Sequence, residues 1–578
     1  MDATRLRTCL QQFEPKLVTT LREGYDLRSL RADAIAGLTV AIVALPLAMA
    51  LAIASGTTPE KGLHTAIIAG FLISALGGSR VQIGGPTAAF IPVVFVVIQK
   101  FGYGGLILCT LLAGLMLVAA GLLRLGTLMK YMPQPVITGF TAGIAVTIFS
   151  SQVKDALGLR MEQVPAEFTE RWAAYAAHIA TTQPATVAMT VLGLAVIVGL
   201  RYWKPKWPGF LIALLVCTVA TTAFGLPTDT IGSRFGELPS ALPSFDFPRI
   251  PFERTFELLP SAFTIAFLAG VESLLSAVVA DGMTGGRHRS NGELVAQGVA
   301  NAASALFGGL PATGALARTA TNIRAGARSP VSGMLHAGYL LLFMLLLAPL
   351  MRYVPLAALA AVLLVVAWNM SEYEHFRTTL SAPWGDRVVL LLTFFLTVFF
   401  DLTVAIEAGV VVAALVFMYR MSESVEISSG VRATDDDLDD AAARARDEQQ
   451  RLRLPPGVEA YQIGGPLFFG AANRLDSLLD QFFEKPKVLI LRMRLVPVID
   501  ASGVHALRKL AERCHREGIV LVVSGLQEQP NRVLVQMGME GWTGGLRLAS
   551  NFDRALKLAQ SIVGASADHP RSAPGAAQ

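Results

Sequence analysis

Two short stretches of the chain combine glycine and proline with small side chains, a pattern that can create an anion site inside a membrane. Residues 81–88 read VQIGGPTA, and residues 306–313 read LFGGLPAT. Proline is well tolerated in the first turn of a helix, so we expect short helices to begin at Pro86 and Pro311. The first amides of a helix lack an intrahelical partner and carry partial positive charge. Two such N-termini facing each other bind an anion with little need for fixed charge.

The residues after each proline are small, which lets a ligand approach the amides. We expect the substrate to contact six of them, which are Thr87, Ala88, Ala89, Thr313, Gly314 and Ala315. Phe90 is a further candidate because its ring can close over a ligand, although a phenylalanine in a span more often faces lipid or the core. The alternative is that glycine and proline merely kink packed helices, which is common in membranes.

Two charged residues lie inside apolar runs, where a charge costs at least about 2.5 kcal/mol at the centre of the bilayer. Glu272 is many residues from either end of its run, and a desolvated carboxylate suits reversible protonation. We expect it to carry a proton or to ligate a cation; the alternative is a structural bond to a neighbouring helix. Arg318 either adds charge to the anion site, balances Glu272, or bonds to a backbone carbonyl.

The composition places these residues in a membrane protein. Of 578 residues, 53% are hydrophobic and only 16% are charged, whereas soluble domains carry about a quarter of charged residues. The net charge of +5 does not indicate a nucleic-acid partner, because the basic residues occupy short loops between apolar runs. The four cysteines have no metal-ligand spacing, so we expect no disulfide framework, metal or cofactor.

Apolar runs that can cross a bilayer, fully or as half-spans, number fourteen. They lie near residues 33–55, 62–78, 86–99, 105–123, 132–153, 184–200, 208–224, 258–280, 292–308, 313–324, 331–351, 355–369, 386–400 and 403–420. The loops after even-numbered runs are basic, which places both termini in the cytoplasm and the chain in the cell inner membrane. The third and tenth runs hold the two breaks, at matching positions of two seven-span halves. Because seven is odd, the second half is inverted, and matched short spans indicate the substrate site.

The C-terminal part of the chain reads as a separate α/β domain. Strand-like runs at 458–463, 487–492 and 519–523 alternate with helix-like runs at 472–483, 503–516 and 528–537. The predicted division is a cytosolic segment at 1–32, a transport domain at 33–421, a charged linker at 422–455, the α/β domain at 456–563 and a disordered tail at 564–578.

Several of these segments resemble the sulfate permease (SulP) family. The resemblance covers residues 33–46 and 77–87, and the segments around Glu272 and Arg318. It implies the seven-plus-seven inverted-repeat fold shared with uracil permease, a core domain that moves against a gate domain, and a homodimer. It also places the anion between spans three and ten, with first-span residues at Leu47 and Leu51 lining the same pocket.

The chain departs from this family at two positions. Many relatives have glutamine where this chain has Leu47, so a side-chain hydrogen bond is missing. Sodium-coupled bicarbonate members ligate sodium at the positions of Glu272 and Ser276, but they carry a hydroxyl residue in place of Leu316. Because a leucine offers no oxygen to a hard cation, this departure favours proton coupling over sodium coupling.

Residues 498–503 (VIDASG) resemble the strand-to-helix turn of STAS domains, which are named for sulfate transporters and anti-sigma-factor antagonists. In bacterial antagonists the serine at the position of Ser502 is phosphorylated. A phosphate at the start of a helix is electrostatically tolerated. The alternative is that Ser502 caps that helix. We also expect the domain to bind a cytosolic protein.

The hypothesis that follows is secondary active transport of a small inorganic anion, with sulfate as the first candidate, coupled to protons and working by alternating access. The same fold also suits bicarbonate, coupled to sodium or not, a dicarboxylate, or a nucleobase. A membrane-anchored STAS signalling protein is a remote alternative, because an anchor needs no inverted broken helices. Since no nucleophile elbow, P-loop or dinucleotide motif occurs in a credible context, we do not expect an enzyme.

Overall fold

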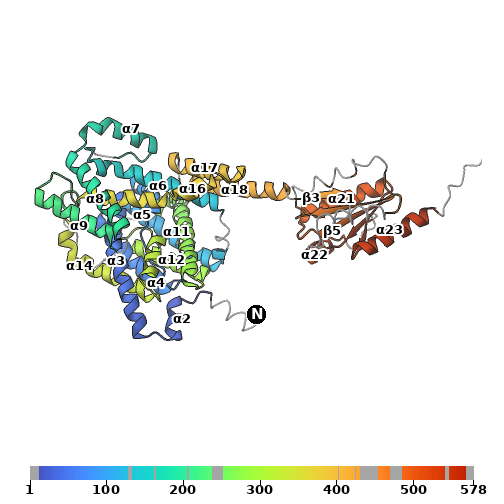
Figure 1. Cartoon of the computed structure of the whole chain (residues 1–578), viewed down its shortest axis with the longest axis horizontal. Helices are drawn as coiled ribbons and strands as arrows, with labels where there is room; N and C mark the ends of the chain where they lie inside the picture. The colour runs from blue at the N-terminus through green and yellow to red at the C-terminus, as the bar shows by residue number, and fades with distance from the viewer. Residues whose placement is uncertain are drawn as a thin grey trace, which may run out of the picture. The chain divides into compact units, whose positions relative to one another are not determined.

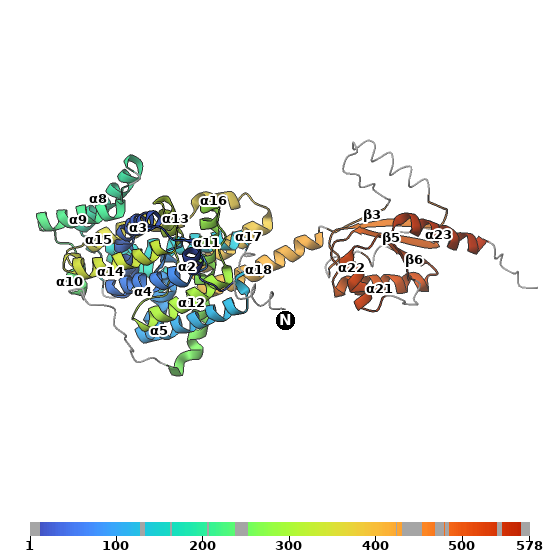
Figure 2. The same cartoon turned by 90° about the horizontal axis from the view of Figure 1, so that it is seen from below.

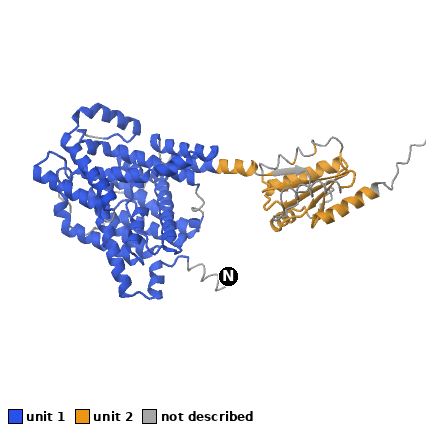
Figure 3. Ribbon diagram, in the orientation of Figure 1, with its two compact units in different colours: residues 1–413 blue, residues 414–578 orange. Residues whose placement is uncertain are grey.

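The chain folds into two compact units. The computed structural model describes residues 12–127, 133–161, 164–204, 207–236, 252–400, 402–423, 425–429, 454–468, 475, 479, 485–539 and 546–567. The first unit is Met1–Ala413 and is helical, and the second is Ala414–Gln578 and contains a sheet (Figure 3).

The first unit is built mainly of helices (Figures 1 and 2). They are α2 (Lys16–Glu23), α3 (Leu27–Ala54), α4 (Pro59–Leu76), η1 (Ala88–Phe90), α5 (Ile91–Leu122), α6 (Gln134–Leu157), α7 (Phe168–His178), α8 (Pro184–Trp203), α9 (Gly209–Phe224), α10 (Ile231–Phe235), α11 (Thr255–Thr284), α12 (Ser290–Leu306), α13 (Leu316–Arg324), α14 (Val331–Met351), α15 (Leu356–Met370), α16 (Tyr373–Thr379), α17 (Trp384–Phe399) and α18 (Leu402–Glu423), which continues into the second unit.

Within the described residues, eight helical segments are long and apolar enough to cross a membrane. A helix lies at each of the fourteen predicted runs once α5 is divided at Gly102, whose non-helical backbone (φ 69°) separates two helices. The number of crossings itself stays a prediction. Helix α3, which holds the first predicted run, begins at Leu27, earlier than expected, because the Asp26 side chain caps it by accepting a hydrogen bond from the amide of Ser29.

The helices of the first unit form two groups. The core group, α3, α4, α5, α11, α12, α13 and α14, packs mainly within itself, and so does the gate group, α6, α8, α9, α15 and α17. Small residues allow close approach inside each group. At the α5–α12 crossing, a Cβ added to Gly114 would lie 2.7 Å from the Gly298 carbonyl oxygen, and one added to Gly298 would lie 2.5 Å from that of Gly114.

A two-residue ladder joins the two predicted breaks. Strand β1 (Gly84–Gly85) pairs antiparallel with β2 (Thr313–Gly314). The predicted helix starts at Pro86 and Pro311 are therefore wrong by two and five residues: η1 begins at Ala88 and α13 at Leu316. The delay has a physical cause, because residues 313–314 are used in the ladder and Ala312 is held by both its amide and its carbonyl against the Asn301 side chain.

The second unit is built on a five-stranded sheet in the order β3-β4-β5-β6-β7. Strand β3 (Glu426–Ser429) runs antiparallel to β4 (Val458–Gly464), and β5 (Val488–Leu495), β6 (Val520–Ser524) and β7 (Leu546–Ala549) continue in parallel. Helices α21 (Ala501–Arg516) and α22 (Glu528–Gln536) pack in one hydrophobic cluster, and α23 (Phe552–Ala567) packs in another, with alternate side chains of β5 and β6.

The predicted strands and the predicted helices at 503–516 and 528–537 are confirmed, whereas the one at 472–483 lies outside the described residues apart from 475 and 479. Two predicted boundaries are wrong. Strand β3 lies inside the stretch expected to be linker, where Val425 is buried in the domain core. Helix α23 reaches Ala567, four residues into the expected tail. The rest of that linker up to residue 453, and residues 568–578, lie outside the described residues.

Candidate anion-binding site

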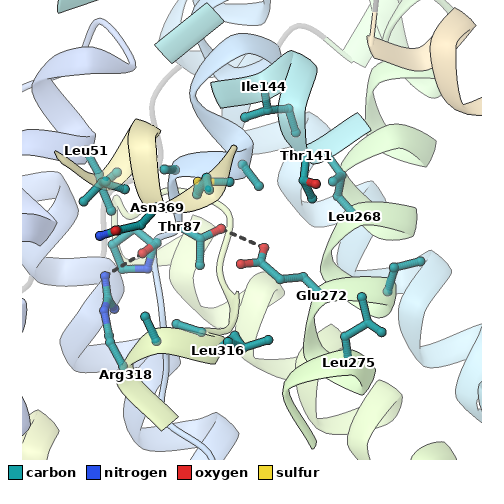
Figure 4. A pocket seen from close by; sticks show the side chains of 18 of the residues that line it. Leu51, Thr87, Thr141, Ile144, Leu268, Glu272, Leu275, Leu316, Arg318 and Asn369 are labelled. Atoms are coloured by element: carbon teal, nitrogen blue, oxygen red, sulfur yellow. Dashed lines mark hydrogen bonds between the residues drawn. The ribbon is translucent and has the colours of Figure 1, made fainter. Parts of the chain in front are cut away.

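A cavity of about 360 Å³ lies where the two helix N-termini of the core group face the gate group (Figure 4). Its core-group wall comes from α3, η1, α11 and α13, and its gate-group wall comes from α6 and α15 with Phe210 of α9. Eight of the predicted site residues line it, and they are Leu47, Leu51, Thr87, Ala88, Ala89, Glu272, Ala315 and Arg318.

The antiparallel ladder explains how residues more than two hundred positions apart reach one cavity. It pairs Gly84 with Gly314 and Gly85 with Thr313, so the chain enters η1 and α13 from neighbouring points. Helix η1 continues into α5, and α13 has nine residues. The first amides of both helices lack intrahelical partners and carry partial positive charge, which attracts an anion to this end of the cavity.

The start of η1 is bonded to the membrane-embedded carboxylate. The hydroxyl of Thr87, the residue before η1, donates to Glu272 Oε2 at 2.9 Å (Figure 4). Glu272 is half-buried and lines the cavity. A charged carboxylate in this position repels an anion, and protonation removes that repulsion. The role of Glu272 as a proton carrier stays a prediction.

Arg318 brings a fixed positive charge to the same end of the cavity. It is the third residue of α13, in the first turn, rather than one to two turns inside the span as expected, because the helix begins later. The side chain is 4% exposed, and Nη2 donates to the Pro86 carbonyl at 2.7 Å. The predicted bond to a backbone carbonyl is thus present. Nε and Nη1 have no partner among the described residues, but both atoms are buried, so they lie beside the cavity as unsatisfied donors and are not exposed in it.

Four predicted residues do not line the cavity. Phe90 is 2% exposed and packs in the core, and a Cβ on Gly314 would lie 1.5 Å from Gln82 Nε2, behind the cavity wall. Thr313 Oγ1 donates to the Ala269 carbonyl at 2.8 Å. Ser276 donates to Thr319 Oγ1 at 3.1 Å and is buried, so its hydroxyl does not stand in the cavity with Glu272.

Behind the ladder lies a buried polar network that the sequence analysis missed. Glu293, fully buried, accepts hydrogen bonds from the amide of Gly78 (2.8 Å) and from Ser273 Oγ (3.0 Å). Gln297 donates to both Glu293 and Ser273, and Gln82 donates to Ser273. The signal was present in the sequence, since Glu293, Gln297 and Asn301 recur every four residues and so share one face of α12. This network fixes the irregular backbone around the two breaks.

The gate group contributes further residues that sequence reasoning did not name. Thr141 and Ile144 of α6 and Asn369 of α15 line the cavity (Figure 4). The lining lies in the first half of α6 and at the end of α15, next to the loops at 123–133 and 371–383. The basic residues of these loops predict that they are cytosolic, so the cavity lies toward the predicted cytosolic face.

Ser502 lies in the second unit. It is the second residue of α21 and is half-buried. Asp500 caps the helix, because its Oδ1 accepts from the amide of Gly503 at 2.8 Å. The interpretation of Ser502 as the capping residue is therefore wrong. Its phosphorylation stays a prediction.

Among the described residues, no group of three or more His, Cys, Asp or Glu side chains is arranged to hold a metal ion.

Comparisons with known proteins show the family of the chain. The family model described as the sulfate permease family matches residues 30–393, and the STAS domain model matches residues 450–555. The Bacillus subtilis protein named "Putative sulfate transporter YvdB" is 44% identical over 520 residues, which is 89% of this chain and 95% of that protein. The bicarbonate transporter BicA of Synechocystis is 29% identical over 557 residues, 94% of this chain and 97% of that protein.

Solved structures show the same fold. Murine Slc26a9, an anion transporter solved in the inward-facing state, superposes with a TM-score of 0.84 at 18% identity, covering 97% of this chain and 95% of that one. The transmembrane domain of a cyanobacterial bicarbonate transporter, BicA, superposes with a TM-score of 0.60 at 30% identity, covering 68% of this chain and 98% of that one. The chain therefore belongs to the sulfate permease family of anion transporters, and it is a multi-pass membrane protein with a C-terminal STAS domain.

Proposed function

We propose that the chain carries a small inorganic anion, with sulfate as the first candidate, across the cell inner membrane by alternating access, coupled to protons. The single observation that carries this proposal is the β1–β2 pairing, which brings two helix N-termini and the side chain of Arg318 to one cavity. Relatives named as sulfate transporters support the choice of sulfate. We expect no enzymatic activity.

Alternating access requires the core group, which holds most of the anion site, to move as a rigid body relative to the gate group. The distribution of contacts supports this division, because the core group and the gate group each pack mainly within themselves. The buried network around Glu293 holds the two breaks to α11 and α12, all within the core group. The gate-group side of the cavity is mostly apolar, including Ile144 and Phe140 of α6, and offers few hydrogen bonds that must break when the core group slides.

Proton coupling follows from the position of Glu272. Since Thr87 joins this carboxylate to the start of η1, a proton on Glu272 removes a negative charge beside the anion. Sodium coupling needs several oxygen ligands. Leu316, which is 42% exposed and lines the cavity, offers none, and Ser276 is turned to Thr319.

Bicarbonate is the second candidate cargo. The relation to BicA proteins favours it, since one of them is 30% identical over 78% of this chain. An anion site made of backbone amides and one guanidinium recognises charge and size more than chemical identity. The site is therefore compatible with either anion.

The orientation, assembly and regulation of the chain belong to the same proposal. The basic loops favour cytoplasmic termini, and the family resemblance favours a homodimer. We expect a cytosolic protein to bind the STAS domain and Ser502 to be a phosphorylation site, because a phosphate at the second position of α21 meets the positive end of the helix dipole.

The test is uptake into proteoliposomes that contain the full chain. Radiolabelled sulfate is offered under an imposed pH gradient or an imposed sodium gradient, with bicarbonate, dicarboxylates and nucleobases as competitors. We expect accumulation that follows the pH gradient and ignores sodium. In Glu272→Gln, a pH gradient no longer drives accumulation, so the gradient-driven component falls at least about tenfold.

The matched control is Glu374→Gln, which removes an exposed carboxylate on α16 that does not line the cavity. Sodium-driven uptake of bicarbonate without sulfate uptake would transfer the proposal to the second candidate. Unchanged uptake by Glu272→Gln at every pH would refute proton coupling through this residue.

A further inference from the structure

The first unit contains a second cavity, of about 400 Å³, that shares no lining residue with the anion-binding site. It is formed by the end of α6, the beginnings of α8 and α15, and α10. Its walls are polar and charged, unlike those of the first cavity. Nothing in the transport mechanism above uses it.

The described residues that line the second cavity carry an excess of positive charge. Lys154, Arg160 and Arg234 face two carboxylates, Asp155 and Asp229. Arg234 forms an ion pair with Asp155 at 2.7 Å. The ammonium of Lys154 donates to the Met161 carbonyl at 2.8 Å, and because a carbonyl carries no net charge, this bond does not neutralise the ammonium. The Arg160 guanidinium has no hydrogen-bond or ion-pair partner among the described residues. The cluster therefore holds one more cation than anion, with donors to spare.

Two helix N-termini add to this potential. Gln183, the residue before α8, and Thr186 of its first turn both line the second cavity, and so do Leu356 and Ala357 at the start of α15. Helices α8 and α15 are 20 and 15 residues long, so both carry a full end charge. The Leu356 amide is bonded to the Asp229 carbonyl and the Ala358 amide to the Pro355 carbonyl, so the Ala357 amide between them is the one left without an intrahelical partner in this first turn. Paired helix starts beside cations repeat the design of the anion-binding site.

The two cavities lie at opposite ends of the same two helices. On α6, the anion-binding site ends at Ile144 and the second cavity begins at Lys154, ten residues further, which is about 15 Å along a helix. On α15, the second cavity is at Ala357 and the anion-binding site begins at Val366. The second cavity therefore faces the side opposite to the basic loops, which is the predicted outer side.

We propose that the second cavity is an outer docking site for a small oxyanion, which the gate group captures before the core group opens to that side. The proposal rests on the transport function proposed above, and it adds a binding site that the transport cycle itself does not require. Cations at the mouth of a pathway raise the local concentration of an anion and its rate of association, and this effect falls with ionic strength. The site therefore acts on capture from outside and not on release inside.

The experiment compares sulfate transport in the two directions in proteoliposomes with a defined orientation of the full chain. The variants are Arg160→Gln and Lys154→Gln, and Lys154→Arg keeps the charge. We expect the neutral variants to raise KM for uptake from the outer side about three- to tenfold with kcat unchanged. KM measured from the inner side stays the same, Lys154→Arg restores the outer KM, and the difference from wild type shrinks at high salt.

Arg254→Gln is the matched control, because it removes an exposed arginine at the start of α11, outside both cavities. An outer KM that equals wild type in both neutral variants, or that rises equally in Arg254→Gln, overturns the proposal. Loss of a co-purified phospholipid from the variants with an unchanged KM also overturns it, in favour of a lipid phosphate site. A wild-type protein that moves no oxyanion refutes the proposed function instead, so the two failures are distinguishable.

Discussion

The core group and the gate group of the first unit are held together in different ways. In the core group, buried polar side chains bond to the backbone of other elements, as Glu293 does to Gly78 and Asn322 does to Val81. In the gate group, buried threonines such as Thr393 and Thr397 bond to carbonyls of their own helix, four residues earlier. The difference follows from the backbone, because the core group contains two broken segments whose polar groups cannot satisfy one another within a helix.

This contrast indicates where the membrane unit tolerates change. A hydrogen bond within a helix adds little to a backbone that is already satisfied, whereas a bond that holds an irregular segment cannot be replaced by water in the membrane. In the core group, a single substitution that removes such a hydrogen bond should therefore lower the stability of the unit markedly. The gate group should respond mainly to changes of shape.

The largest expected effect is at Arg318, whose charge serves the cavity directly. Arg318→Gln removes charge-assisted hydrogen bonds to an anion, which are worth about 1.5–3 kcal/mol, so sulfate uptake falls by about ten- to a hundredfold. Arg318→Lys keeps the positive charge but loses the planar set of guanidinium donors, and we expect an intermediate rate of sulfate uptake. The control is Arg387→Gln in the gate group, where the guanidinium bonds to the Ala382 carbonyl away from the cavity. Wild-type uptake by Arg318→Gln would show that the guanidinium has no role in binding.

A smaller effect is expected at Glu293, on stability rather than on the substrate. Glu293→Ala leaves a buried amide, a hydroxyl and a carboxamide without their acceptor, and we expect unfolding free energy to fall by on the order of 3 kcal/mol. Thr397→Val in the gate group removes only a bond inside α17, and we expect a change within about 0.5 kcal/mol. Thermal unfolding in detergent measures both. If the two variants shift the unfolding temperature equally, the contrast between the groups is wrong.

Two glycines, one in each group, differ in how tightly they are packed. Gly314→Ala places a methyl group 1.5 Å from Gln82 Nε2, so Gln82 must release Ser273, and we expect a loss of about 1–3 kcal/mol with reduced transport. In Gly199→Ala on α8 the added carbon meets nothing within 4 Å, and helix propensity favours alanine by about 1 kcal/mol. Stability and uptake are measured on both variants. A Gly314→Ala protein as stable and active as Gly199→Ala would mean that the ladder is not tightly packed.

Much of the fold could be predicted because the signals are local. Apolar runs mark the helices, alternating strand-like and helix-like runs mark the STAS domain, and GGP-type sequences mark the breaks. The start of helix α13 could not be predicted from local signals. Pro311 permits a helix, but the ladder with β1 and the Asn301 side chain hold the backbone extended until Ala315. Strand β3 was missed for a related reason, because its four residues acquire their role only by pairing with β4.

The candidate site divides along the same line. Side chains next to the breaks, such as Thr87 and Arg318, were predicted because clusters of glycine and proline mark the breaks in the sequence. Thr313 was placed in the cavity because a helix start was assumed there, and in the structure it is buried in β2. Asn369 was missed because nothing in its own helix marks it as facing a site. Its role arises when α15 packs against α6.

The proposed transport mechanism depends on the anion lying between the starts of η1 and α13. The most direct test is an anomalous difference map of the full chain with selenate, under conditions in which the protein is shown to transport selenate. We expect a selenium peak between the amides of Ala88 and Leu316 and beside the Arg318 guanidinium, close enough for the selenate oxygens to accept hydrogen bonds from these groups. A selenium peak elsewhere in the core group, with this space empty, would contradict the mechanism.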